Sequence, residues 1–326
     1  MDLPLVADEA HGGGARDRAG RGRRDSYRLL ARNAVRHVDG RRVRLVARRP
    51  AARDAHPAPA PPTPDNANDV ANAAEVRIRC FGRFELSRNG VTVERWRRRA
   101  AERLLKYLLV NGRRGHRDVL LEMLWPDVPF ASSIRGLRVT LHALRRALTA
   151  AAPDRPHVDL IRAEGDTYVL NTRGVWIDAD EFGEHYAAGI RFEREKNIEA
   201  ASREYAAAEA LYRDDFLIED LYEDWTVLRR EELKDQYLQI LSKLSQFCLA
   251  ASDLDGCIRR SHALVAKEPC SEDAYQRLMR CYTRLGQRGS ALRWYQICER
   301  TLRQELDVAP SENTRRLYLE IINSSA

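Results

Sequence analysis

The pattern of apolar positions changes once along the chain, from short alternating stretches to long helical periods. Residues 76–94 alternate apolar and polar side chains and include an Asn89-Gly90 pair, which predicts strands joined by a hairpin. Three amphipathic helices are expected next, at residues 97–114, 116–127 and 132–148, the last with Ser132 or Ser133 as its N-cap. Residues 157–171 then predict two short strands around a tip at Glu164-Gly165-Asp166. This order of elements is typical of a winged helix-turn-helix.

From Trp176 onward the apolar positions follow the 3.6-residue period of helices. Helices are expected at about 179–190, 196–212, 224–251, 254–267, 271–285, 288–305 and 311–323. A 34-residue tetratricopeptide-like pattern of aromatic and small residues also recurs here. One copy has Tyr275, Leu278, Tyr282, Ala291, Tyr295 and Cys298, a second has Gly189, Phe192, Ala201, Tyr205 and Ala208, and a degenerate middle copy has Leu244, Cys257 and Pro269. Small residues let paired helices approach, and aromatic residues fill the groove between them.

These patterns predict a mostly α protein with three segments. Residues 76–172 form an α+β winged helix-turn-helix, and residues 173–326 form an all-α tetratricopeptide-like domain. Residues 1–75 are expected to be a disordered basic tail, which ends in a Pro/Ala linker at residues 56–69. The alternatives for this tail are an arm that adds nonspecific phosphate contacts, or a true start that lies downstream.

Charge is distributed unevenly over these segments. Residues 76–172 carry 19 Lys and Arg against 10 Asp and Glu, a net charge of +9, whereas residues 173–326 carry a net −6. Residues 1–53 carry a net +8 and residues 54–75 a net −4. Such asymmetry indicates a polyanion-binding module joined to a module with a different partner.

The motifs of the common enzyme and cofactor classes are absent from the sequence. There is no phosphate-binding loop, no dinucleotide fingerprint, no zinc-protease helix and no nucleophile elbow, and neither the histidines nor the six cysteines have metal-ligand spacing. We therefore expect a non-enzyme without cofactor or metal, and we interpret the acidic run at residues 219–224 as a solvated loop. With no apolar run of eighteen residues and no signal peptide, we expect no membrane partner and a cytoplasmic, nucleoid-associated protein.

The predicted helix at residues 132–148 has two contrasting faces. Its core stripe consists of Ile134, Leu137, Leu141, Leu144 and Leu148. The opposite face is the candidate for reading bases, and it comprises Arg135, Arg138, Val139, His142 and Arg146. That face carries no acidic residue, and Gly136 and Ala143 make the helix slim, as suits a major groove about 12 Å wide. Candidates for phosphate or wing contacts are Arg97, Arg98, Arg99, Arg113, Arg114, Arg117, Arg145, Arg162 and Thr167.

The motifs of both modules resemble one family of bacterial regulators. The segments "AERLLKYLLVNGRRGHRDVLLEMLWPD", "SSIRGLRVTLHALRRAL" and "IRAEGDTYVL" look like the winged helix of OmpR-type regulators, in the version found in SARP-type (antibiotic regulatory protein) activators. The segments "IDADEF", "YEDWTVLRREEL", "KEPCSEDAYQRLMRCYTRLGQRGSALRWYQ" and "LRQELDVAPSENTRRLYLEI" look like the bacterial transcriptional activator domain. The resemblance covers about residues 76–323.

The resemblance implies a transcriptional activator that binds direct repeats in double-stranded DNA near promoters, as a homodimer, and contacts RNA polymerase. Two positions depart from the family pattern: Asp166-Thr167 separate Gly165 from Tyr168 in the wing, and Asp307 stands where the closing motif has glycine. The small two-module form is expected, without receiver or ATPase domains. The alternative is a tetratricopeptide-type adaptor whose winged helix is repurposed for protein contacts. An adaptor would have no need of a helix face free of acidic residues.

Overall fold

The chain is described by a computed structural model that covers residues 75–94, 96–154, 156 and 158–323. The expectations about the basic tail and the linker fall on residues outside this range. No helix in the described part of the chain is both long enough and apolar enough to cross a membrane.

A four-stranded sheet opens the described chain. It consists of β1 (Val76–Arg79), β2 (Glu85–Arg88), β3 (Val91–Thr92) and β7 (Val175–Ile177), in the order β3-β2-β1-β7. β1 is antiparallel to β2 and parallel to β7. The predicted turn is present at Asn89 and Gly90, where both residues have positive φ angles, as a two-residue hairpin requires. In β1 the apolar residues Val76 and Ile78 are buried and the residues that alternate with them are half-buried, as the alternating pattern predicted.

The predicted three helices and hairpin follow the first strands. The helices are α3 (Arg99–Val110), α4 (Arg117–Leu124) and α5 (Phe130–Ala151), and the hairpin is β5 (Ile161–Glu164) with β6 (Thr167–Leu170). A further strand, β4 (Arg114–His116), pairs with β6 and completes a three-stranded wing in the order β4-β6-β5. The three residues of β4 are too few to give a periodic signal, so the sequence pattern missed this strand.

The start of α5 differs from the prediction. The helix begins at Phe130 with Pro129 as the N-cap, two residues before Ser132. The Ser133 hydroxyl is buried and donates to the carbonyl of Phe130 (2.9 Å), which is the contact of a serine inside a helix. Ser132 and Ser133 are therefore first-turn residues, and the prediction of either as the N-cap was wrong.

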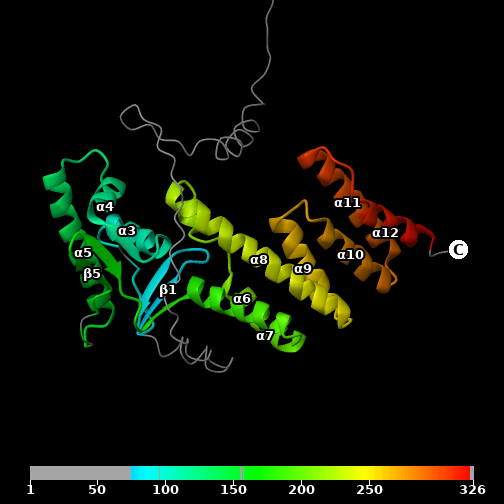
Figure 1. Cartoon of the computed structure of the whole chain (residues 1–326), viewed down its shortest axis with the longest axis horizontal. Helices are drawn as coiled ribbons and strands as arrows, with labels where there is room; N and C mark the ends of the chain where they lie inside the picture. Colours follow the sequence, from blue (N-terminus) through cyan, green and yellow to red (C-terminus); the bar gives the residue numbers. More distant parts are fainter. Residues whose placement is uncertain (1–74, 95, 155, 157, 324–326) are drawn as a thin grey trace, which may run out of the picture. The chain divides into compact units, whose positions relative to one another are not determined.

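Seven α-helices follow β7 in the described chain (Figure 1). They are α6 (Asp178–Arg194), α7 (Ile198–Leu211), α8 (Asp224–Ala250), α9 (Leu254–Lys267), α10 (Glu272–Arg284), α11 (Arg288–Leu306) and α12 (Glu312–Asn323). The pairs α6–α7, α8–α9 and α10–α11 pack closely, and this confirms the tetratricopeptide-like architecture. In the first pair Gly189 lies directly against the ring of the buried Tyr205, so the pattern of small and aromatic residues corresponds to a contact.

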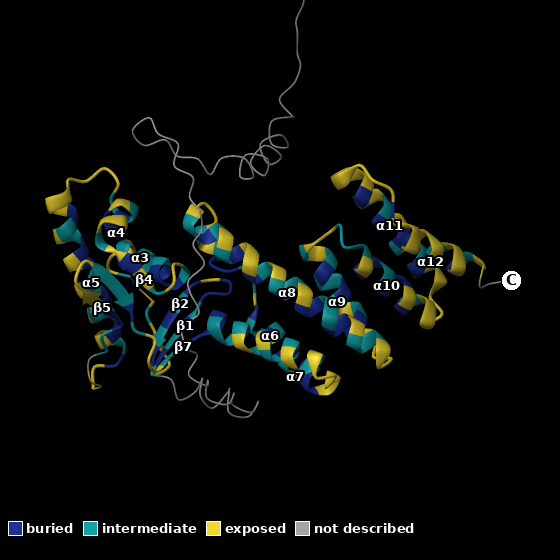
Figure 2. Cartoon of the chain, in the orientation of Figure 1, coloured by how far each residue is buried: buried dark blue, intermediate teal, exposed yellow. Residues whose placement is uncertain are grey.

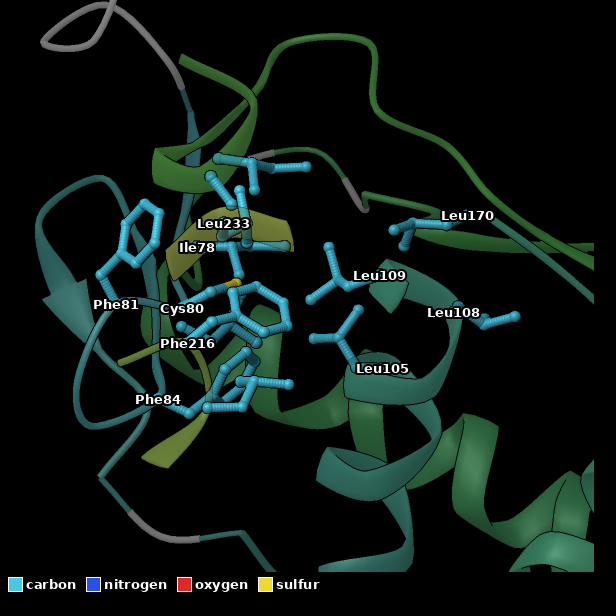
Figure 3. Packing of buried hydrophobic residues seen from close by; sticks show 14 of the residues in the cluster. Ile78, Cys80, Phe81, Phe84, Leu105, Leu108, Leu109, Leu170, Phe216 and Leu233 are labelled. Carbon is cyan, nitrogen blue, oxygen red and sulfur yellow. The ribbon is translucent and has the colours of Figure 1, made fainter. Parts of the chain in front are cut away.

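The two modules share one hydrophobic core. Ile78 and Phe81 from the sheet region, Leu105 from α3, Phe216 from the segment before α8 and Leu233 from α8 are buried in the same cluster (Figure 3). Phe81 also forms an isolated β-bridge with Phe216. The winged helix is therefore packed against α8 and the segment before it.

The acidic run at residues 219–224 does not form the solvated loop that we expected. Part of it belongs to a short 3-10 helix, Ile218–Asp220, and the carboxylates of Glu219, Asp220 and Glu223 contact α3. Asp220 accepts from the nearly buried ammonium of Lys106 (2.7 Å), and Glu223 accepts from Arg103 (2.8 Å). These partners lie more than 110 residues away in the sequence, which is why the local pattern could not reveal them.

Candidate nucleic-acid interface

The inner face of α5 fixes the helix to the rest of the winged helix. Leu137, Leu144 and Leu148 are buried, and Ile134 and Leu141 are half-buried, in contact with α3, α4 and β2. This is the predicted core stripe. Burial of one such leucine contributes about 1.5–3 kcal/mol to the free energy of unfolding. The buried stripe therefore fixes which face of α5 points toward solvent.

The fully buried Arg88 of β2 holds the C-terminal end of α5. Its Nη1 donates to the Leu148 carbonyl (3.2 Å), and its guanidinium also contacts Glu75 and the Pro156 carbonyl. Carbonyls in the last turn of a helix lack partners within the helix, so a buried guanidinium here caps α5.

The outer face of α5 is exposed along the predicted positions. Arg135, Arg138, His142 and Arg146 are exposed, and 43% of Val139 is accessible. The side chains of these five residues form no hydrogen bond or ion pair with other described residues. Figure 2 shows exposed and buried positions alternating along α5. The arginines of this face therefore present donors whose charge no carboxylate of the described residues neutralises.

Gly136 has a different reason for its small size from the one we inferred. A Cβ at this position would lie 3.2 Å from the ring of Trp125, just beyond the end of α4. The glycine therefore allows close packing between α5 and the turn that precedes it. The interpretation of Gly136 as a slim position that faces a groove was wrong.

The phosphate candidates fall into two groups. Arg97, Arg98, Arg99 and Arg162 are exposed, and no partner of their side chains lies among the described residues. Arg114, Arg117 and Arg145 pair with Glu164 (3.0 Å), Asp166 and Asp159 (3.1 Å), respectively. The side chains of these pairs are between 30% and 62% exposed, so each pair contributes little and leaves the arginine able to exchange its carboxylate for a phosphate. Thr167 is half-buried at the start of β6.

Arg113 has a role within the protein. Its guanidinium contacts the carboxylate of Asp180 in α6, and its Nη1 donates to the Leu109 carbonyl (3.1 Å). A guanidinium held in this way has few donors left for DNA. Arg113 thus connects α3 and α6, and the sequence pattern could not show this because Asp180 lies 67 residues away.

A shallow groove joins two residues from different groups of candidates. Arg97 and Arg146 both line a groove of about 230 Å³ between β3 and the C-terminal half of α5, together with Val91, Glu94 and Ala150. The structure therefore places one phosphate candidate beside one base candidate.

Two exposed residues near α5 were absent from the sequence-based set. Phe130 in the first turn is 55% exposed, and the guanidinium carbon of Arg117 lies 5.6 Å from its ring centroid. His116 is exposed and caps α4, because its Nδ1 accepts from the Asp118 amide (3.3 Å). Phe130 was missed because the helix was expected to begin after it.

Among the described residues, no group of three or more His, Cys, Asp or Glu side chains has the arrangement needed to hold a metal ion. The surface offers guanidinium donors on one rigid helix, flanked by arginines on a wing and at the start of α3.

Comparisons with known proteins place these features in a family context. Residues 177–322 match the family model of the bacterial transcriptional activator domain. The chain is 24% identical over 265 residues to the transcriptional regulatory protein MoaR1 of Mycobacterium tuberculosis, with 80% of this chain and 85% of MoaR1 aligned. It is 25% identical over 209 residues to the regulatory protein DnrI of Streptomyces peucetius, with 63% of this chain and 76% of DnrI aligned.

The fold of the chain is also found in a solved structure. Mycobacterium tuberculosis EmbR, solved in complex with a low-affinity phosphopeptide, superposes with a TM-score of 0.62 at 20% identity. The match covers 77% of this chain and 66% of the EmbR chain. It supports the arrangement of a winged helix followed by a helical domain.

Proposed function

We propose that this chain, a SARP-type regulator with a bacterial transcriptional activator domain at residues 177–322, is a sequence-specific DNA-binding transcriptional activator. It binds direct repeats near promoters as a dimer and helps to recruit RNA polymerase, and it acts at the nucleoid in the cytoplasm. The similarity to MoaR1 and DnrI supports a role in transcription regulation.

The observation that carries this proposal is the outer face of α5. Its four exposed cationic or imidazole side chains have no intramolecular partner among the described residues, and the opposite face is fixed by the core stripe. A rigid helix with unpaired arginines matches the major groove, where arginine donates in a bidentate manner to guanine O6 and N7. Val139 has the shape and polarity to contact a thymine methyl group.

The remaining arginines fit the phosphates on either side of the groove. Arg162 belongs to the wing, and Arg97, Arg98 and Arg99 precede or begin α3. Phosphate contacts of this kind position a protein on DNA without reading sequence, whereas base contacts specify the site. The proposal therefore assigns different roles to α5 and to its surroundings.

Substitutions in α5 test the proposal directly. The DNA for a fluorescence-anisotropy titration comes from the regions upstream of the operons that neighbour the gene of this protein. With this DNA, Arg135→Ala and Arg146→Ala should each weaken specific binding by about 1–3 kcal/mol. Arg162→Ala should weaken binding to all sequences alike and reduce the slope of log affinity against log salt by about 1.

Arg300→Ala is the matched control, because Arg300 is an exposed arginine of α11. Its affinity should equal that of the wild type. If the wild-type protein shows no preference over competitor DNA at moderate salt, the activator proposal fails and the adaptor alternative takes its place.

A further inference from the structure

The groove between β3 and the C-terminal half of α5 has walls that the fold holds in place. Its volume is about 230 Å³. On one side, Thr92 of β3 pairs with Ser87 of β2, and the Val93 amide donates to the Leu86 carbonyl (2.8 Å). On the other side, the buried Leu148 holds α5 against the core. Because both walls belong to regular elements, an occupant can bind without the entropic cost of ordering them.

The α5 wall of the groove consists of alanines next to one arginine. Ala147, Ala150 and Ala151 follow Arg146 by one, four and five positions, so the four residues share one side of the helix. Alanine ends at its Cβ and leaves open the space that a larger side chain would fill. From β3, Val91 also lines the groove, and it is 52% exposed. The valine and the alanines give the groove an apolar lining.

The charged side chains of the groove do not neutralise one another. Arg97 and Arg146 are exposed, and neither forms an ion pair or a side-chain hydrogen bond within the described part of the chain. Glu94 also lines the groove, and it too has no ion pair with a described residue. Two guanidiniums and one carboxylate leave a net charge of +1, which a ligand with a single negative charge balances.

The size and the lining of the groove select the class of ligand. Pockets for drug-sized ligands measure about 300–1,000 Å³, so a groove of about 230 Å³ suits a smaller molecule. A guanidinium can bind a carboxylate through two parallel hydrogen bonds, and the alanines can bury an apolar body beside it. A DNA phosphate would contact the arginines but leave the apolar lining unfilled, and Glu94 would repel it.

We propose that this groove binds a small organic monocarboxylate with an apolar body. Arg97 and Arg146 hold the carboxylate, and Val91, Ala147 and Ala150 contact the apolar part. The consequence for DNA rests on the proposed function, which assigns Arg146 to base reading. A bound carboxylate occupies that arginine and should lower the affinity for specific DNA, and by linkage DNA should lower the affinity for the carboxylate.

The test uses the full-length chain with hexanoate as the probe. Saturation-transfer NMR detects the bound probe, and a titration without DNA gives its dissociation constant. Acetate has the charge without the apolar body, and hexanol has the body without the charge. Each of these two compounds should bind about tenfold more weakly than hexanoate or less, because each lacks one half of the recognition.

Two variants separate the apolar lining from the charge. Ala150→Leu fills the groove without changing its charge, and it should weaken hexanoate binding about tenfold through steric overlap. Arg97→Gln should weaken hexanoate binding by a similar factor, about tenfold, but leave hexanol binding unchanged. Ala131→Leu is the matched control, since Ala131 is an exposed alanine of α5 outside the groove, and it should bind hexanoate like the wild type. The melting temperature of each variant shows whether it is folded.

Equal hexanoate affinity of folded Ala150→Leu and the wild type overturns the inference, and so does a wild type that binds hexanol as tightly as hexanoate. If hexanoate does not bind and Ala150→Leu weakens binding to all DNA sequences alike, the groove holds a DNA phosphate instead.

DNA affinity is measured separately by fluorescence anisotropy, so that the two proposals can fail independently. Hexanoate that binds in the groove but leaves specific DNA affinity unchanged supports the site and refutes the base-reading role of Arg146. A wild type that binds hexanoate in the groove and prefers no DNA refutes the DNA-binding proposal alone.

Discussion

At the level of single residues, Asp178 is a buried carboxylate at the junction between the modules. It is 3% exposed, and both its oxygens accept from the Cys80 amide (2.8 Å), while Oδ2 also accepts from the Phe81 amide (3.1 Å). Burial raises the pKa of Asp178 to about 6, although these hydrogen bonds oppose the shift. The residue thus joins the end of β1 to the start of α6.

This shift predicts a pH dependence of stability. The pKa in the folded state lies above the ordinary value of 3.8, so the favourable contribution of the protonated group is complete below about pH 4. It is lost as the pH rises through about 6, because the unfolded chain ionises first. The unfolding free energy of the wild type relative to Asp178→Asn should fall by about 2–3 kcal/mol over this window.

Urea unfolding followed by circular dichroism at pH 4.5, 5.5 and 7 measures this difference. Asp178→Asn keeps an oxygen acceptor for the Cys80 and Phe81 amides but cannot ionise, so other titrating groups cancel in the comparison. A difference that does not change with pH would show that Asp178 titrates at its ordinary pKa.

At the level of elements, the contact between α6 and α7 depends on Gly189. A Cβ at this position would overlap the ring of Tyr205, which is 1% exposed and cannot move aside. Gly189→Ala should therefore lower stability by about 1–3 kcal/mol through overpacking. Gly183 lies in the same helix, and a Cβ at this position would meet no atom within 4 Å, so Gly183→Ala should instead raise stability by about 0.5–1 kcal/mol.

Thermal unfolding of the two alanine variants provides the measurement. Opposite shifts in melting temperature are expected from the same substitution in one helix. Equal shifts would mean that helix propensity alone determines the effect of alanine at position 189, and that the close approach of Tyr205 does not require a glycine there.

The elements also show what the sequence can and cannot reveal. Periodicity correctly predicted the buried stripe of α5, because a 3.6-residue repeat of leucines has few other interpretations. It missed the start at Phe130 and the reason for Gly136, since both depend on how α5 meets Trp125 and the turn before it. The ion pair between Arg113 and Asp180 could not be predicted either, because ion pairs between distant segments leave no local pattern in the sequence.

At the level of the molecule, the proposed boundary between residues 172 and 173 divides the sequence but not the core. β1 pairs with β7, which lies beyond that boundary. Phe81 packs on Phe182, Tyr212 and Phe216, all of which lie beyond that boundary. The position of the winged helix is thereby tied to α6 and to the segment that precedes α8.

A shared core predicts that a fragment of residues 76–172 does not fold alone, whereas residues 75–323 do. The short fragment lacks β7, which pairs with β1 in the whole chain. It also exposes Ile78, Phe81 and Leu105, which are at most 2% exposed in the whole chain. Leaving three such side chains in water costs about 1.5–3 kcal/mol each, a large part of the stability of a domain this size. We expect poorly dispersed amide resonances and no cooperative melting for the short fragment. A fragment that melts cooperatively and binds DNA like the full chain would show that the winged helix has a core of its own, and that the contacts with α6 and α8 only position it.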